Sequence, residues 1–128
     1  MTIAEWSLLA AVVLYLLTLA PAKPIGWREF DNAKPRDPAF WEKPIRARML
    51  GAHLNGVETF PLFAAAVLLA EFRHCPQAHI DALAVAFVAI RVFYVLAYVG
   101  DRPTIRTLLW NAGFFVNVAI FVQPLFNR

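Results

Sequence analysis

The chain has 128 residues, of which 60% are hydrophobic, with a formal net charge of +3 and one cysteine. This apolar share is well above that of an ordinary soluble domain, so a membrane protein is the leading class. The single cysteine, Cys75, excludes an internal disulfide and a cysteine-rich metal site. No phosphate-binding loop, HExxH motif or nucleophile elbow occurs, and no metal site is predicted.

Four apolar stretches predict membrane-spanning helices at residues 3–20, 49–70, 80–99 and 108–126. Each has about 18 to 22 residues, enough to cross a hydrocarbon core of roughly 30 Å. The predicted fold class is an all-α membrane protein, a four-helix up-and-down bundle forming one domain over residues 1–128. A soluble four-helix bundle is the alternative, but its helices should carry charged faces, and these are apolar nearly all round.

The first span also has some features of a signal peptide, because small residues follow it at positions 20–22. Its leader contains the acidic Glu5 and no Lys or Arg before the apolar run. Secretory leaders usually begin with a positive charge, so we expect the span to be retained.

The first connection, residues 21–46, is long and rich in proline and aromatic residues. Its prolines are Pro21, Pro24, Pro35, Pro38 and Pro44. A continuous helix is therefore not expected. The aromatic residues Trp27, Phe30, Phe40 and Trp41 suggest that it packs at the membrane interface. A loop of this length is often functional, and a connector lying on the lipid surface is the equal alternative.

Basic residues gather on one side of the predicted topology. The first and third connections carry Lys23, Arg28, Lys34, Arg36, Lys43, Arg46, Arg48, Arg102 and Arg106, and the opposite side has Arg73 and Arg128. The positive-inside rule then places the first connection in the cytoplasm and both termini on the other face. Beside membrane spans this charge indicates topology and contact with anionic lipids, not nucleic acid.

Polar residues interrupt the second and third spans on single helical stripes. Arg48, Asn55 and Glu58 are separated by seven and then three residues, and Arg91, Tyr94 and Tyr98 by three and then four.

The two spans run antiparallel, so the depths of these residues can be compared. Asn55 is expected roughly 10 Å, Glu58 roughly 15 Å and Arg91 roughly 13 Å from the cytoplasmic end. We therefore predict an ion pair between Glu58 and Arg91, in a polar cleft that opens towards Arg106. The alternative is a purely structural pin that fixes helix register. His53 lies on another side of the helix, where a packed neutral histidine is the default interpretation.

The segments "RMLGAHLNGVETFPLF" and "RVFYVLAYVGDRPTIR" resemble the MAPEG family, membrane-associated proteins in eicosanoid and glutathione metabolism. The resemblance covers nearly the whole chain. It implies a left-handed four-helix bundle assembled as a homotrimer, with glutathione bound between subunits near the cytoplasmic side. It also implies that Asn55 and Glu58 contact glutathione, that Arg91 orders Glu58, and that Tyr94 and Tyr98 line the pocket.

The resemblance further implies that Arg106 is catalytic, because a cation near the sulfur favours the thiolate. Two departures stand out. Gly51 takes the place of an arginine that several glutathione-binding members have four residues before the asparagine, and the candidate replacements are Arg48 and a basic residue of the first connection. The spacing from Tyr98 to Arg106 differs by one residue from that of some members. Thr59 matches the prostaglandin branch of the family better than leukotriene C synthase.

The expected function is a glutathione-dependent transferase or peroxidase that acts on a small lipophilic electrophile in the membrane. A non-catalytic membrane scaffold or regulator of the same family is the alternative, favoured by Gly51. A small transporter is not favoured, because paired Gly/Pro interruptions at the midplane are missing. The short chain suggests a bacterial inner membrane, and an endoplasmic-reticulum membrane is the alternative.

Overall fold

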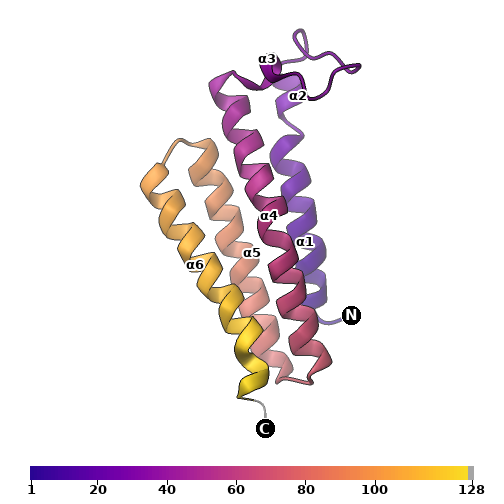
Figure 1. Ribbon diagram of the computed structural model, residues 1–128, viewed down its shortest axis with the longest axis vertical. Coiled ribbons are helices and arrows are strands. Elements are labelled where there is room, and N and C mark those ends of the chain that lie inside the picture. The colour runs from indigo at the N-terminus through magenta and orange to yellow at the C-terminus, as the bar shows by residue number, and fades with distance from the viewer. Residues whose placement is uncertain (127–128) are drawn as a thin grey trace.

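A computed structural model of the chain describes residues 1–126 (Figure 1). The elements are α1 (Ile3–Leu19), α2 (Ala22–Ile25), α3 (Pro38–Trp41), α4 (Pro44–Phe72), α5 (Gln77–Val99), α6 (Pro103–Val122) and the 3₁₀ helix η1 (Gln123–Leu125). Within this part of the chain all regular structure is helical. The segments long and apolar enough to cross a membrane are Ile3–Ile25, Pro44–Phe72, Gln77–Val99 and Pro103–Leu125. The predicted all-α four-span fold is confirmed.

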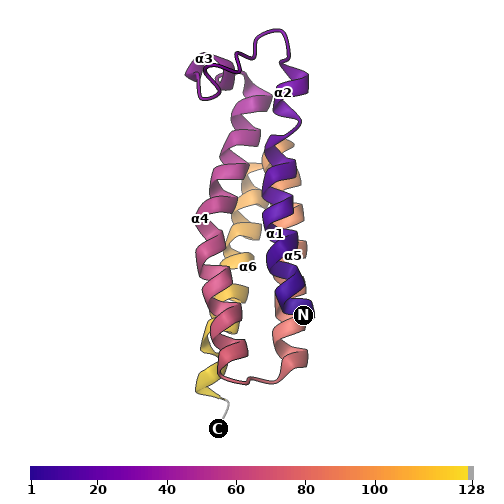
Figure 2. The ribbon, with the colours of Figure 1, turned by 90° about the vertical axis from the view of Figure 1, so that its right-hand side faces the viewer.

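The helices run up and down, with α4 and α5 in the middle of the bundle. α1 packs on both of them from one side, and α6 packs on both from the other side (Figures 1 and 2). The α1–α4 connection and the α5–α6 turn lie towards one end, and the N-terminus and the α4–α5 turn lie towards the other (Figure 1). The bundle therefore has a basic end and an opposite end, as the charge distribution predicts.

The helices begin earlier than hydropathy predicts. α4 begins at Pro44 and α6 at Pro103, and α5 follows Pro76 directly. Proline suits the first turn of a helix, because its missing N–H would have no partner there and its φ is already helical. Arg46 and Arg106 consequently lie on the first turns of α4 and α6, although both precede the apolar runs.

α1 and α4 approach each other closely at Gly56. A β-carbon on this residue would overlap the Tyr15 ring, which is 4% exposed. Small residues at such crossings let two membrane helices gain contact area. Tyr15 thereby reaches the middle of the bundle, where it lies near the Arg91 guanidinium.

The first connection is folded onto the start of α4, and the expected absence of a continuous helix is confirmed. Phe40 is buried and contacts the Phe30 and Trp41 rings edge-to-face. The buried Arg46 lies over the Phe40 ring, 4.2 Å from its centre, and donates a hydrogen bond to Glu29 at 2.5 Å. This hydrogen bond lowers the pKa of the Glu29 carboxyl below its ordinary value.

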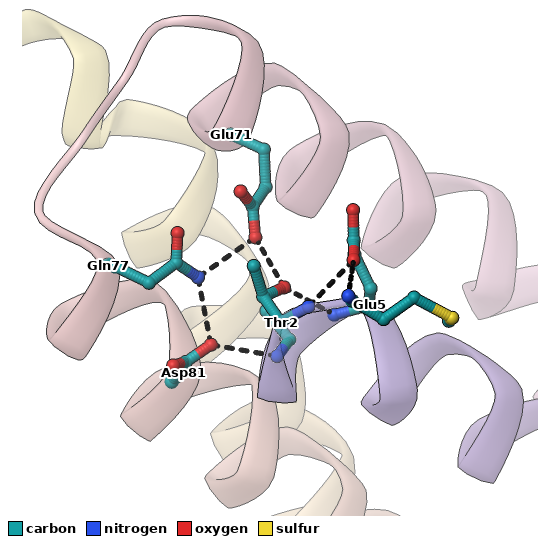
Figure 3. Close-up of polar contacts among 7 residues, drawn as sticks. Thr2, Glu5, Glu71, Gln77 and Asp81 are labelled. Carbon is teal, nitrogen blue, oxygen red and sulfur yellow. Dashed lines mark hydrogen bonds and ion pairs between the residues drawn. The ribbon is translucent and has the colours of Figure 1, made fainter.

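A network of hydrogen bonds closes the opposite end (Figure 3). The Thr2 hydroxyl donates to Glu71 at 2.7 Å, and the Asp81 carboxylate accepts from the Ala4 backbone N–H at 2.8 Å. The Gln77 amide donates to both carboxylates at 2.9 Å. The start of α1 is thus fastened to both sides of the α4–α5 turn.

Candidate functional site

Two adjoining cavities lie between α4, α5 and α6. The first has a volume of about 440 Å³ and extends towards the α5–α6 turn at the basic end. The second has a volume of about 260 Å³ and extends towards the middle of the bundle, where Gly113 lies. Asn55, Glu58 and Trp110 line both cavities, which places the two spaces side by side.

The first cavity is lined by the polar residues that the sequence places on three helices. They are Asn55, Glu58, Tyr94, Tyr98 and Arg106. Two residues of the α4 stripe, Asn55 and Glu58, thus lie with Tyr94 and Tyr98 of the α5 stripe, and α6 adds the arginine from its first turn.

Contacts with aromatic rings hold the α5 and α6 side chains on the wall of this first cavity in place. The Tyr94 and Tyr98 rings meet edge-to-face with centres 5.8 Å apart, and the Arg106 guanidinium lies 4.6 Å from the centre of the Tyr98 ring. A cation over an aromatic face is attracted by the ring quadrupole. Tyr98 also packs against Gly51, where its hydroxyl takes the space that a β-carbon would occupy.

The predicted ion pair between Glu58 and Arg91 is wrong. The ion pairs in residues 1–126 join other groups, and the Arg91 Nε and Nη2 atoms have no hydrogen-bond partner there. The two residues share a cavity and hence a depth, but the Glu58 side chain is exposed, whereas Arg91 is 2% exposed. Arg91 instead lies over the Tyr94 ring, 4.1 Å from its centre.

Arg48 lies outside both cavities. Its Nε donates to the Val99 carbonyl at 2.9 Å, and its Nη1 lies 4.0 Å from an Asp101 carboxylate oxygen. Asp101 has a positive φ of 57° at the turn that follows α5. Arg48 therefore holds the C-terminal end of α5 against α4. Its positive charge also interacts favourably with the negative end of the α5 helix dipole.

His53 points to α1, away from both cavities. Its Nδ1 lies 2.9 Å from the Tyr15 carbonyl oxygen. A carbonyl oxygen only accepts hydrogen bonds, so Nδ1 must carry the proton. The histidine thus bridges α4 and α1, which agrees with the expectation that it lies on another side of the helix from Asn55.

Several residues that line the cavities are not indicated by the sequence pattern. Asn117 on α6 is 1% exposed, lines the second cavity and has an Oδ1 atom without a hydrogen-bond partner in the described residues. Trp110 and Thr107 line the first cavity. The available signal was the pair Asn111 and Asn117, which interrupts an otherwise apolar span. One helical stripe could not show which of the two faces inwards.

Metal-binding side chains do not gather in the described residues: no three His, Cys, Asp or Glu side chains there could hold a metal ion. Cys75, which is buried, lines neither cavity. The candidate site is therefore built chiefly from two amides, a carboxylate, two phenols and two guanidinium groups.

Comparison with known proteins gives one assignment. The sequence model of the MAPEG family matches residues 3–126, nearly the whole chain. No curated protein and no solved structure matches it.

Proposed function

From the premise that this chain belongs to the MAPEG family, we propose that it is a glutathione-dependent transferase or peroxidase acting on lipophilic electrophiles in the membrane. The observation that carries the proposal is the meeting of Asn55, Glu58, Tyr94, Tyr98 and Arg106 around one cavity. Its volume of about 440 Å³ is within the range of roughly 300–1,000 Å³ typical of small-molecule sites.

The groups on the cavity wall suit the chemistry of a tripeptide. The Glu58 carboxylate can accept hydrogen bonds from an α-ammonium, and the buried Asn55 Oδ1, which has no partner in the described residues, can accept from a peptide N–H. The two tyrosine hydroxyls both donate and accept. Glutathione carries an ammonium, peptide groups and carboxylates, so the donor and acceptor set fits it.

Arg106 is the proposed catalytic residue. It lines the cavity, and the Tyr98 ring at 4.6 Å fixes its guanidinium. A cation beside a thiol stabilises the thiolate and lowers the thiol pKa, and the thiolate is the nucleophile. An electrophile that enters from the bilayer would be held beside the glutathione sulfur. Holding the two reacting groups close together raises the reaction rate.

A homotrimer is also proposed, and the exposed residues at the open side of the first cavity support an assembly. Glu58 is exposed there at mid-span of α4, next to the exposed Leu54 and Val57. A carboxylate at this depth is costly in lipid and normally faces protein or a polar cavity. A neighbouring subunit on this face would remove Glu58 from lipid. In this proposal the basic end faces the cytoplasm of a bacterial inner membrane, with both termini on the other side.

A thermal titration tests the proposal. A ligand that binds only the folded state raises the unfolding temperature as its concentration exceeds the Kd. Glutathione should therefore stabilise the detergent-purified chain, whereas ophthalmate, which lacks the thiol but keeps the other groups, should bind without supporting turnover. Activity of the thiol is then read from conjugation of a chloronitrobenzene. No stabilisation at millimolar glutathione would instead support the second candidate, a non-catalytic scaffold.

The scaffold is favoured by one specific contact. Arg48, the basic residue nearest in sequence to the position of the missing arginine, is held at the end of α5 by Val99 and Asp101. A carboxylate of glutathione would then need a cation from the first connection or from a neighbouring subunit.

A further inference from the structure

A third cavity lies at the basic end of the bundle, on the α1 side. The first connection lies over the ends of α1 and α4 (Figure 1), and the cavity is enclosed by these three segments. It has a volume of about 570 Å³, and the residues that line it include Leu19, Lys23, Arg36, Trp41 and Leu50. Its described lining contains no residue of α5 or α6, so it is a different space from the candidate site, although Leu54 borders both it and the first cavity.

Two cations on the wall of this third cavity have no counter-ion. Lys23 and Arg36 are exposed, and the ion pairs in residues 1–126 join other groups. The Lys23 ammonium lies 4.7 Å from the centre of the Phe30 ring, a contact that leaves its charge without an anion. Two such cations around one space favour an anion with several oxygens, and phosphate is a common ligand of both Lys and Arg.

The carboxylates of the first connection do not neutralise this pair of cations. Glu29 accepts a hydrogen bond from Arg46, and the Asp31 and Asp37 carboxylates accept from backbone N–H groups two residues further along the chain. Glu42 forms none of the ion pairs in residues 1–126, and none of these four acids lines the third cavity. The cavity therefore carries positive charge that the described part of the chain leaves uncompensated.

The third cavity combines these charges with an apolar wall on the membrane spans. Lys23 lies at the end of the first span, whereas the half-buried Leu19 and Leu50 belong to α1 and α4 themselves. The Trp41 indole lines the same cavity and is fixed by a hydrogen bond of 3.1 Å to a backbone carbonyl of the connection. Tryptophan is enriched at the level where lipid head groups meet hydrocarbon. Charge at the span ends and apolar side chains on the spans suit an amphipathic ligand.

We infer that the third cavity binds an anionic phospholipid of the leaflet at the basic end. Lys23 and Arg36 hold its phosphate, and one acyl chain lies against Leu19 and Leu50. Basic pockets beside membrane helices bind anionic head groups, and each Lys or Arg near the surface strengthens the attraction about fivefold. A free phosphate would leave the apolar wall unused, which favours the lipid. This inference does not rest on the proposed function, because it involves neither glutathione nor Arg106.

The test uses the delipidated full chain in detergent, without glutathione. Dioleoylphosphatidylglycerol is titrated in mixed micelles, with bound lipid counted by native mass spectrometry and stability followed as the shift in Tm. Dioleoylphosphatidylcholine has the same chains and no net charge, and glycerol 3-phosphate has the phosphate and no chains. The inference expects saturable binding of one phosphatidylglycerol per chain with a rise in Tm, at least fivefold weaker binding of phosphatidylcholine, and no stabilisation by glycerol 3-phosphate at the same concentrations.

Paired variants identify the site. Lys23→Gln combined with Arg36→Gln should weaken phosphatidylglycerol binding about 25-fold, at about fivefold for each cation removed. Arg28→Gln combined with Lys34→Gln is the matched control. Both of these residues are exposed in the same connection and do not line the third cavity, so the net charge falls equally while the cavity is unchanged. The control pair should weaken binding much less than the cavity pair.

Four results would overturn the inference. Equal binding of the two phospholipids would show that the lipid charge is not recognised. Equal losses in the two variant pairs would indicate a diffuse effect of surface charge. Binding of glycerol 3-phosphate as tight as that of the lipid would indicate a site for a soluble phosphate. No saturable binding of phosphatidylglycerol, together with a changed oligomeric state in the cavity pair, would indicate that a neighbouring subunit covers this surface.

Discussion

The Tyr98 hydroxyl occupies the space beside Gly51 in which a β-carbon would lie. α4 and α5 meet closely at this point, and both residues line the first cavity. An arginine at position 51, which the resemblance attributes to several family members, cannot coexist with Tyr98 in this position. Gly51 therefore does more than replace an arginine: it leaves the space that the Tyr98 side chain fills.

The first prediction concerns this contact. Gly51→Ala should lower the free energy of unfolding by about 1–3 kcal/mol, the usual cost of overpacking, because the Tyr98 ring must move. The displaced ring should also weaken ligand binding in the first cavity. Thermal and denaturant unfolding in detergent measure the stability effect. If the contact is responsible, Gly51→Ala combined with Tyr98→Ala should cost less than the sum of the two changes.

Gly113→Ala is the matched control for Gly51→Ala. A β-carbon there would lie 3.6 Å from Ile90 and 3.8 Å from Phe87, which is ordinary contact. Alanine is also the better helix former by about 1 kcal/mol. Gly113→Ala should therefore be neutral or stabilising, and equal destabilisation of the two variants would contradict the proposed overlap at Gly51.

The second prediction concerns pH and the first connection. The hydrogen bond from Arg46 lowers the pKa of Glu29, so the folded state binds this proton less readily than the unfolded state. The contribution to stability is therefore present above the ordinary Glu pKa, about 4.3, and is lost as pH falls through the lowered value. At pH 7 the wild type should have a higher Tm than Glu29→Gln, and this difference in Tm should shrink below about pH 4.

Glu42→Gln is the control for that pH series. Glu42 is exposed in the same connection and forms none of the ion pairs in residues 1–126. Its substitution should change Tm little at either pH. A difference between wild type and Glu29→Gln that stays constant with pH would refute the assignment.

The sequence was sufficient for the fold because membrane spans are set by composition over long windows. Helix starts were less accurate, because Pro44 and Pro103 begin helices within charged segments that hydropathy treats as loop. Helical spacing also correctly grouped Asn55, Glu58, Tyr94 and Tyr98. These features depend on local periodicity and chain geometry alone.

Pairing between helices required information that periodicity does not contain. Depth placed Glu58 and Arg91 at one level, but Glu58 is exposed on the cavity wall and forms no ion pair with the buried Arg91. Asn117 and Asn111 looked equivalent in the sequence for the same reason, because the rotation of α6 decides which one is buried. The fit of Tyr98 to Gly51 likewise depends on the distance between two helices.

The third prediction concerns the network in Figure 3. Thr2→Val removes both the N-cap of α1, where the hydroxyl accepts from the Glu5 N–H, and the hydrogen bond to Glu71. The expected loss is about 0.5–2 kcal/mol of unfolding free energy, as for other caps. Thr104→Val, exposed on the first turn of α6, should have a smaller effect. Equal losses in the two variants would show that the cap and the Glu71 contact add nothing.

The fourth prediction separates thiol activation from glutathione binding. Arg106→Ala should lower the conjugation rate at pH 7 about tenfold or more and move its pH dependence to higher pH, because the thiol would lose a cation that lowers its pKa. Arg106→Lys should restore part of the rate. Glu58→Gln should instead raise the Kd for glutathione, since the ammonium loses a charged partner, without moving the pH profile of bound enzyme.

The control for this fourth prediction is Arg102→Ala. Arg102 is exposed at the N-cap of α6 and lines neither cavity, so its removal changes the net charge of the same turn without touching the site. Long-range charge effects are weakened by salt, whereas an effect at contact distance is much less so. An equal loss of rate in Arg102→Ala and Arg106→Ala would contradict a catalytic role for Arg106. An unchanged pH profile in Arg106→Ala would contradict it as well.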